Sequence, residues 1–221
     1  MTKSFVHLHA HTEYSMLDGA AKIVDYLKKV KELNQPAAAI TDHGNLYGAM
    51  EFVQKANDFG IKPIIGYEAY ITPGSRFDRP DRENNKRYHL TLLAENNIGY
   101  QNLVELVSKA YTEGYYYKPR IDYELLDQHH DGLIALSGCL GGELAQHLAP
   151  DGSVEEGNTS NERSFEKALD IAKKYQSIFG KENYFIEIHN HGIKQQLDIL
   201  DDLVEIAEII EAPLVAANDS H

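Results

Sequence analysis

The chain has 221 residues, of which 43% are hydrophobic and 25% charged, as expected for a soluble globular protein of one barrel or two small domains. Its formal net charge of −13 excludes a broad basic groove, so binding to nucleic acid would require locally concentrated basic residues or bound cations. No apolar run approaches the roughly 20 residues that cross a bilayer, no signal peptide precedes the first strand-like run, and one cysteine excludes an internal disulfide. We therefore expect a cytoplasmic protein without a membrane partner.

Strand-like and helix-like segments alternate along the chain. Short apolar runs predict strands, and apolar residues spaced three and four apart, as at Ile23, Leu27 and Val30, predict amphipathic helices. In chain order we expect a strand over 5–9, a helix over 20–33, a strand over 37–41, a helix over 46–59, strands over 62–71 and 88–94, a helix over 99–111, a strand over 133–137, helices over 143–148 and 164–179, a strand over 184–189, a helix over 193–210 and a strand over 213–217.

Such alternation is typical of parallel α/β folds, and both an open doubly wound sheet and a closed barrel satisfy it. An open sheet gathers its site at one or two strand ends, whereas here all seven predicted strands end near residues that can bind metal ions. Strand ends from a whole sheet converge when the strands close around one axis, so we predict a parallel barrel in a single domain over 1–221. Because no helix follows the seventh strand, we expect the chain to be a piece of a longer one.

The candidate metal ligands recur one or two at a time along the chain. Imidazole, carboxylate and thiolate groups are the side chains that bind divalent transition metals. The candidates are His9, His11, Asp18, His43, Glu68, His89, Cys139, Asp219 and His221, and we expect His189 and His191 to contact either a metal or the substrate.

Two pairs of these residues have the spacing of neighbours on one face of a strand. His9 and His11 are two residues apart and can share one ion, and so can Asp219 and His221. His7, two residues before His9, would lie on the same face of the strand, so periodicity does not decide which two of the three histidines bind the ion. His7 can instead form a hydrogen bond with a residue that binds the ion. Three imidazoles gathered without a cation would compete for hydrogen-bond partners, which favours a metal site.

Three positions allow a structural role beside a chemical one. Asp42 can accept the second ring N–H of His43, which would fix a metal-binding tautomer, or cap the helix that follows. Glu68 lies in an apolar strand, where an uncompensated carboxylate is costly and a bridged metal would explain its burial. Cys139 is either a small buried hydrophobe or a thiolate ligand that favours zinc.

The expected chemistry is metal-dependent hydrolysis of a phosphoester. The segment S-G-C-L-G-G at 137–142 lacks the G-x-S-x-G pattern of serine hydrolases, and the chain has no Walker motif. Attack on phosphorus by a metal-activated water remains, with the central catalytic side chains expected to be His9, His11, Glu68 and Asp219.

Two segments interrupt the alternation and are candidates for substrate contact. The polar loop over 72–87 carries five basic residues, and the segment G-Y-Y-Y-K-P-R at 114–120 is aromatic and basic. We expect Lys118 and Arg120 to contact phosphate while tyrosines stack on an unpaired base, with His191 as a further substrate contact. Packing against other domains explains these segments equally well.

Together these motifs resemble a known family. H-A-H-T at 9–12, T-D-H at 41–43, Glu68, His89, Cys139 and N-D-S-H at 218–221 resemble the polymerase and histidinol phosphatase (PHP) family. Four longer segments are similar to the branch of this family found at the N-terminus of bacterial replicative DNA polymerases. They are F-V-H-L-H-A-H-T-E-Y-S-M-L-D-G, A-I-T-D-H-G-N-L-Y-G, K-P-I-I-G-Y-E-A-Y and Y-Y-K-P-R-I-D. This resemblance covers essentially the whole chain.

The resemblance implies a distorted (β/α)7 barrel with two to three divalent ions, namely zinc, manganese or iron, with magnesium as a further option. By analogy, one ion is held by His9, His11, Glu68 and Asp219. Glu68 bridges to a second ion bound by His89 and Cys139, and a third is held by Asp18, His43 and His221.

The resemblance also implies that an intact site acts as a 3′–5′ proofreading exonuclease. Its partners would be the 3′ end of DNA, the remaining polymerase domains of a longer chain, and other replisome subunits. Two alternatives remain: a non-catalytic scaffold that metals stabilise, and a small-molecule phosphatase, which does not explain the polymerase-like segments.

Overall fold

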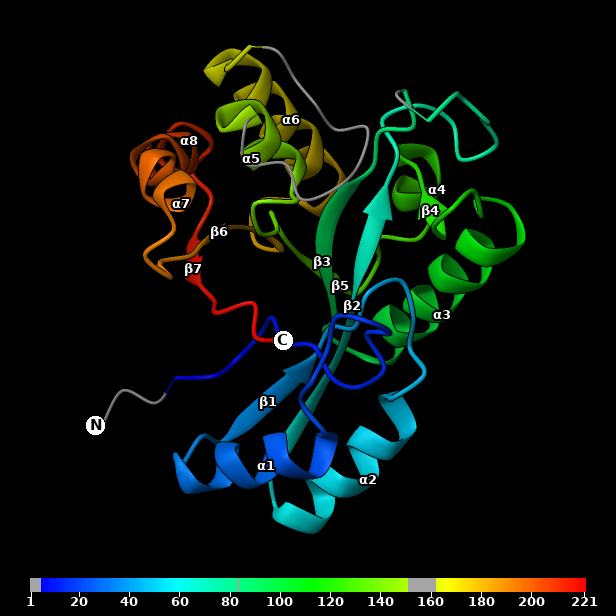
Figure 1. Ribbon diagram of the computed structural model, residues 1–221, viewed down its shortest axis with the longest axis vertical. Coiled ribbons are helices and arrows are strands. Elements are labelled where there is room, and N and C mark those ends of the chain that lie inside the picture. Colours follow the sequence, from blue (N-terminus) through cyan, green and yellow to red (C-terminus); the bar gives the residue numbers. More distant parts are fainter. Residues whose placement is uncertain (1–4, 83, 151–161) are drawn as a thin grey trace.

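In the computed structural model, which describes residues 5–82, 84–150 and 162–221, a curled mixed sheet is flanked by helices (Figure 1). The sheet order is β1-β2-β3-β5-β6-β7, and β4 pairs with β2. The strands are β1 (Ala37–Ile40), β2 (Lys62–Ile71), β3 (Tyr88–Ala94), β4 (Arg120–Ile121), β5 (Leu133–Leu136), β6 (Tyr184–Ile188) and β7 (Leu214–Ala216). The helices are α1 (Ile23–Glu32), α2 (Ala49–Phe59), α3 (Asn97–Thr112), α4 (Tyr123–Gln128), α5 (Glu143–Leu148), α6 (Phe165–Phe179), α7 (Lys194–Asp198) and α8 (Leu200–Ile210).

Local sequence explains where several helices begin and end. The side chain of Asn96 caps α3 by accepting hydrogen bonds from the backbone N–H groups of Ile98 and Gly99. Helix α2 ends at Gly60, whose φ of +71° is in the left-handed region that glycine adopts without a Cβ penalty. Helix α1 carries Lys29 and Lys31 in its last turn, where positive charge complements the helix dipole.

One strand runs against the predicted direction. Strand β3 pairs antiparallel with both β2 and β5, so the prediction of an all-parallel barrel is wrong at this strand. The register places His89, near the start of β3, opposite Tyr70, near the end of β2. His89 therefore reaches the same edge of the sheet as residues that follow the carboxyl ends of parallel strands.

The predicted strand over 5–9 is not a regular strand, but this segment still joins the two edges of the sheet. The N–H of Thr41 donates to the carbonyl of Ala10 at 2.9 Å, and the N–H of His11 donates to the carbonyl of Ser220 at 2.7 Å. The N-terminal segment thus lies between β1 and the segment after β7. A distorted (β/α) barrel describes this arrangement, as predicted from the family resemblance.

Two other differences from the predicted elements are local. The helix expected over 193–210 is divided into α7 and α8 at Ile199, and the short elements β4 and α4 were not predicted.

Within the described residues, no helix is both long and apolar enough to cross a membrane.

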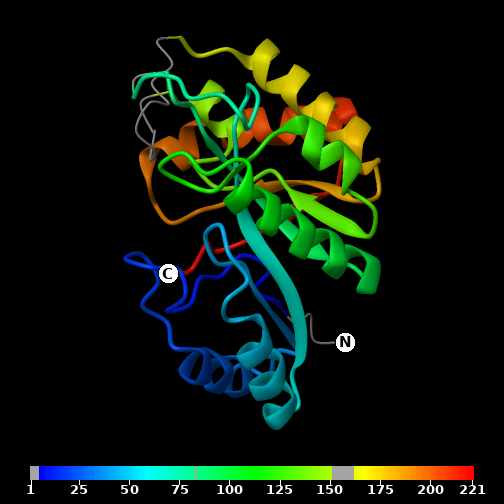
Figure 2. The same ribbon diagram turned by 90° about the vertical axis from the view of Figure 1, so that its right-hand side faces the viewer.

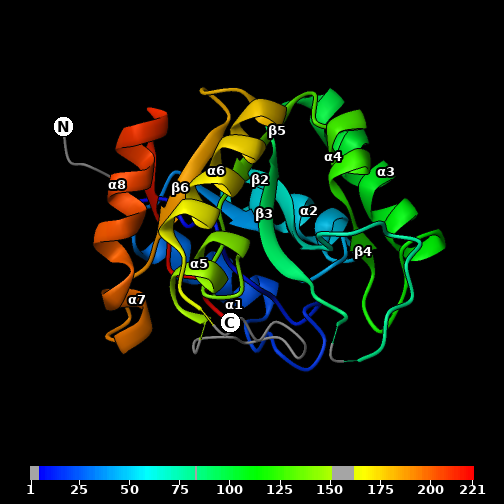
Figure 3. The ribbon, with the colours of Figure 1, turned by 90° about the horizontal axis from the view of Figure 1, so that it is seen from above.

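The described residues form three apolar clusters, and two of them pack helices against the sheet. Ile23 and Leu27 of α1 pack with Phe52 of α2 beneath β1, and each is fully buried. The larger cluster lies between the rest of the sheet and α3, α4, α5, α6 and α8, and Figure 3 shows these helices spread along the outer side of the sheet. Burying one such side chain stabilises the fold by roughly 1.5–3 kcal/mol. Strand β2 runs from one end of the molecule to the other (Figure 2).

Candidate metal centre

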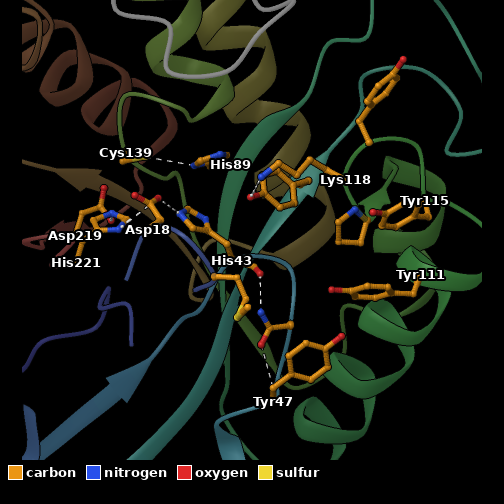
Figure 4. Close-up of a pocket in the computed structure, with 15 residues that line it drawn as sticks. Asp18, His43, Tyr47, His89, Tyr111, Tyr115, Lys118, Cys139, Asp219 and His221 are labelled. Atoms are coloured by element: carbon orange, nitrogen blue, oxygen red, sulfur yellow. Dashed lines mark hydrogen bonds and ion pairs between the residues drawn. The ribbon is translucent and has the colours of Figure 1, made fainter. Parts of the chain in front are cut away.

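The candidate ligands meet at one edge of the sheet. His9 and His11 come from the N-terminal segment and Asp18 from the loop that follows it. The others are His43 after β1, Glu68 in β2, His89 in β3, Cys139 after β5, and Asp219 and His221 after β7. Figure 4 shows Asp18, His43, His89, Cys139, Asp219 and His221 facing one another around a cleft. Residues separated by up to 212 positions are thus brought together by the curvature of the sheet.

The innermost group consists of two histidines and two carboxylates. Nε2 of His9 lies 3.3 Å from Oε1 of Glu68 and 3.2 Å from Oδ1 of Asp219, and Nε2 of His11 lies 3.3 Å from the same Asp219 oxygen. Both Nε2 atoms and the Asp219 oxygen are buried and make no hydrogen bond. Buried polar atoms are normally satisfied, so three unsatisfied ones aimed at one another fit a bound cation.

Glu68 lies at the middle of the whole constellation. Its Oε2 is 2.6 Å from Nδ1 of His43, its Oε1 is 3.1 Å from Nδ1 of His89, and Sγ of Cys139 is 3.7 Å from Oε1. Burial by itself would raise the pKa of Glu68, but His89 and His9 hold it well below the ordinary value. An ionised carboxylate with both oxygens directed at different ligands is suited to bridging two ions.

The outer group lies nearer the solvent. Nε2 of His43 is 2.8 Å from Oδ2 of Asp18, and Nδ1 of His221 is 3.6 Å from the same oxygen. The ring of His221 stacks on that of His11, with centroids 4.2 Å apart and planes 5° apart. Nε2 of His221 also lies 3.2 Å from Oδ1 of Asp219, which connects the outer group to the inner one.

The ligand sets that the structure brings closest together differ in part from those that the resemblance implies. Among the described residues, four groups have ligand atoms within 4.8 Å of one another: His9, His11 and Asp219; His43, Glu68 and His89; His11, His43 and His221; and His9, Glu187 and His189. His43 therefore lies between the second and third predicted sets. Clusters of ligand atoms this close together are suited to holding metal ions, whereas the division among ions stays a prediction.

Protonation in the cluster is set by opposing effects. Burial lowers the pKa of His9, but Glu187, Asp219 and Glu68 outweigh it, so the pKa is well above 6.5. Burial, with a further contribution from Glu68, raises the pKa of the Cys139 thiol to about 11. A metal ligand must lose these protons, so ions and protons compete for the same atoms.

Glu187 of β6 is a buried residue that the sequence prediction missed. Its Oε1 lies 2.7 Å from Nδ1 of His9 and 2.8 Å from Nε2 of His189, and all three side chains are buried. Burial would raise the pKa of Glu187, but His9 and His189 hold it at about 2, so the ionised carboxylate accepts the Nδ1–H of His9. This tautomer turns Nε2 of His9 toward Asp219. The sequence contained a signal for the role of Glu187, because this residue, like Glu68, is a carboxylate within an apolar strand.

His11 is oriented through a second chain of hydrogen bonds. The Ser15 hydroxyl donates to Oδ1 of Asp42 at 2.9 Å, so it accepts from Nδ1 of His11 at 2.8 Å. Asp42 makes no bond to the ring of His43, and α2 begins after Gly48, so both roles predicted for Asp42 are wrong. The carboxylate–histidine arrangement exists, but it serves His11 through Ser15.

His7 takes no part in the cluster. Its ring packs edge-on against Phe5 at 4.9 Å and faces Tyr26 at 6.5 Å, on the side of α1. Loss of regular strand geometry over this segment removes the common face that parity would have given it.

A cleft of about 550 Å³ opens beside the cluster and contains one of the three predicted substrate contacts. Lys118 lines this cleft and donates to the hydroxyl of Tyr70 at 3.2 Å. His191 is exposed outside the lining, with its ring 5.4 Å from that of His189 and its Nδ1 3.1 Å from Nε2 of Gln196.

The expectation that Arg120 contacts phosphate does not fit its position. The side chain is completely buried, and its guanidinium donates to the carbonyls of Gly114, Arg76 and Asp78 and to the side chain of Asn85. The donors that would bind phosphate are already used to fix the surrounding loops.

Two basic residues of the loop over 72–87 are likewise engaged within the fold. Arg76 is 7% exposed and forms ion pairs with Glu113, Asp122 and Glu124. Arg79 donates to three backbone carbonyls. Arg76 and Arg79 are therefore committed to contacts within the fold rather than to a basic entrance to the cleft.

Comparison with known proteins gives the family. Residues 7–191 match the model of the PHP domain. The chain belongs to the PHP family. Among curated proteins, this PHP domain is 50% identical over 225 residues to the DNA polymerase III subunit alpha of Thermus aquaticus, covering 98% of the chain and 17% of that protein. It is 47% identical over 219 residues to the subunit of Treponema pallidum, covering 99% of the chain and 18% of that protein. The PHP domain thus spans less than a fifth of these relatives.

Solved structures agree on the fold. A protein from Bifidobacterium adolescentis, described by its assigned role as a metal-dependent phosphoesterase, superimposes with a TM-score of 0.52 at 11% identity, covering 99% of this chain and 88% of that one. A two-domain protein from Bacteroides vulgatus, described as containing a PHP-like metal-dependent phosphoesterase, gives a TM-score of 0.54 at 12% identity, covering 98% of this chain and 51% of that one. Identities this low support the shared barrel only.

Proposed function

We propose that this chain is the PHP domain of a bacterial replicative DNA polymerase, and that its site removes nucleotides from the 3′ end of DNA in a metal-dependent reaction. The observation that supports this most directly is the convergence of unsatisfied buried atoms of His9, His11 and Asp219 beside an open cleft. We infer two to three divalent ions, held by His9, His11, Asp18, His43, Glu68, His89, Cys139, Asp219 and His221.

The chain's own residues supply orientation and charge. Glu187 and Ser15 fix the tautomers of His9 and His11, so that both Nε2 atoms face the carboxylates. Lys118 places a positive charge along the cleft, where it can pair with a phosphate of the strand. Divalent ions in such a site neutralise the phosphodiester and make water a stronger nucleophile at neutral pH.

The shape of the site favours catalysis over a purely structural metal centre. Structural sites are closed by protein ligands, whereas catalytic sites keep open positions. Asp18, His43 and Asp219 all line the cleft, so ions bound there would face solvent and substrate. The scaffold alternative would instead require a saturated, closed set of ligands.

The test combines metal content with release of the 3′-terminal nucleotide from a labelled single strand. We expect two to three ions per chain and activity that disappears on chelation and in Asp219→Asn. The matched control is Asp170→Asn on α6, an exposed carboxylate outside the cleft lining and the ligand groups, which should leave activity unchanged. Tightly bound metal without nucleotide release, from single strands or frayed duplexes, would support the scaffold.

A further inference from the structure

Four tyrosines form one wall of the cleft beside the metal centre. The tyrosine wall consists of Tyr47 after β1, Tyr111 of α3, and Tyr115 and Tyr117 after α3. Figure 4 shows Tyr47, Tyr111 and Tyr115 on one side of the cleft and Asp18, Asp219 and His221 on the other, with Lys118 between them. The cleft thus has an aromatic end and a metal-ligand end.

The tyrosine wall is unusually exposed for an aromatic cluster. Tyr47, Tyr115 and Tyr117 are 62%, 53% and 63% exposed. The ring of Tyr111 is nearly parallel to that of Tyr115, with 6.0 Å between centroids and 26° between planes, and lies 6.5 Å from Tyr47. These rings contribute little to the core, and a gathered exposed aromatic surface is typical of a binding site.

The backbone at one of these tyrosines, Tyr117, has an energetically unfavourable conformation. Tyr117 has a φ of +62°, in the left-handed region that bulky residues seldom adopt. The turn is maintained by a hydrogen bond from the N–H of Tyr116 to the carbonyl of Lys118. Strain of this kind, of order 1–3 kcal/mol, persists where the surrounding structure determines the conformation and often accompanies functional sites.

We propose that the tyrosine wall binds an unpaired nucleobase whose phosphodiester lies at the metal centre. The flat faces of the rings suit stacking on a base, which contributes to binding of single strands irrespective of sequence. Among the described residues that line the cleft, Lys118 is the only lysine or arginine, so the anionic part of the ligand is directed toward Lys118 and the ligand cluster rather than toward the wall. This proposal rests on the proposed function and names the substrate as an unpaired 3′ end.

The lining indicates little discrimination among bases. Among the described residues that line the cleft, Asn45 is the one amide side chain, and both ends of its amide are engaged: Nδ2 donates to the carbonyls of Tyr14 and His43, and Oδ1 accepts from the N–H of Tyr47. This described lining therefore leaves no amide to read a base edge. A volume of about 550 Å³ lies within the range of small-ligand sites and suits one unpaired nucleotide.

The test measures binding separately from hydrolysis. The probe is a single-stranded dodecamer that ends in 2-aminopurine, joined through a phosphorothioate that keeps the negative charge and slows hydrolysis, and the protein is the zinc-loaded chain. We expect fluorescence quenching on binding, with weakening of about tenfold in Tyr115→Leu or Tyr117→Leu and little change in Tyr115→Phe. The control is Tyr100→Leu, a partly exposed tyrosine of α3 outside the cleft, which should bind like the parent chain.

Two outcomes would overturn the tyrosine wall as a base site. One is equal binding of the parent chain to a dodecamer with an abasic 3′ residue, and the other is unchanged binding in the Tyr115 and Tyr117 variants, which would point to a protein partner for this surface. If these occurred while nucleotide release from ordinary strands persisted, only the base site would fail. Stacking without any release would instead contradict the proposed exonuclease.

Discussion

Nδ1 of His9 lies 2.7 Å from Oε1 of Glu187, and both side chains are completely buried. The contact fixes which nitrogen of His9 carries the proton and which faces Asp219. Carboxylates that hold a metal-binding imidazole in this way raise its basicity and fix its orientation. Glu187 is therefore a positioning residue for the proposed inner ion.

We expect Glu187→Gln to lower the affinity for the most tightly bound ion by about 10- to 100-fold. A glutamine can still accept the hydrogen bond, but it removes the buried negative charge that supports His9. Competition with a chelating dye measures the affinity. Glu182→Gln, an exposed residue before β6, is the matched control. Equal metal affinity in the two variants would contradict the positioning role.

Cys139→Ser should change which metal is bound rather than whether one is bound. A thiolate favours softer ions, and Cys139 lies 3.7 Å from Nδ1 of His89 beside Glu68. We expect the ratio of zinc to manganese, measured by mass spectrometry after loading from an equimolar mixture, to fall in this variant. An unchanged ratio would show that the thiol is not a ligand.

Metal affinity should rise with pH between about 6 and 9. The pKa of His9 is raised above 6.5, and that of Cys139 to about 11, so a bound ion must displace protons from both. Dissociation constants measured across this range, with proton release followed in weak buffer, test the linkage. A pH-independent affinity would contradict it.

Metal removal should also reverse the pH dependence of stability. Because the folded pKa of His9 is raised, its contribution to the metal-free protein is complete below 6.5 and is lost as pH rises through the folded pKa. Glu187 has a lowered pKa of about 2, so its contribution is present above about 4.5 and is lost on acidification toward 2. With chelator we expect a lower Tm at pH 9 than at pH 6.5; with metal we expect the opposite order.

Arg120→Met and Lys118→Met should separate structural from substrate roles. Removing the buried guanidinium of Arg120 leaves several acceptors unsatisfied, which costs roughly 2–4 kcal/mol and lowers Tm by about 5–15 °C. Lys118→Met should leave Tm nearly unchanged but slow nucleotide release by about tenfold. Among the described residues that line the cleft, Lys118 is the one lysine or arginine, so this substitution removes their positive charge. Thermal unfolding and initial rates check both, and a reversed pattern would restore Arg120 as a phosphate contact.

Much of the fold follows from local pattern. Strands β2 and β3 and helix α5 have the predicted bounds, because a long apolar run or a helical repeat is bounded by polar or glycine-rich segments. The direction of β3 was not available from pattern, since an apolar strand buried on both faces reads the same in either direction. The irregular path of 5–9 and the break at Ile199 were also missed, because long-range packing overrides local preference there.

The candidate site likewise depends partly on the sequence and partly on the tertiary structure. Sequence alone determined the chemistry: histidines spaced by two, a carboxylate in an apolar strand and one cysteine carry their ligand character wherever they lie. Only the tertiary structure decided which atoms face one another, because antiparallel β3 brings His89 to Glu68, and Glu187 on β6 reaches His9 from 178 residues away. It also decided that Arg120 is used within the fold while Lys118 reaches the cleft. Residue type fixes what a side chain can bind, but burial and hydrogen bonding determine whether its donors remain available.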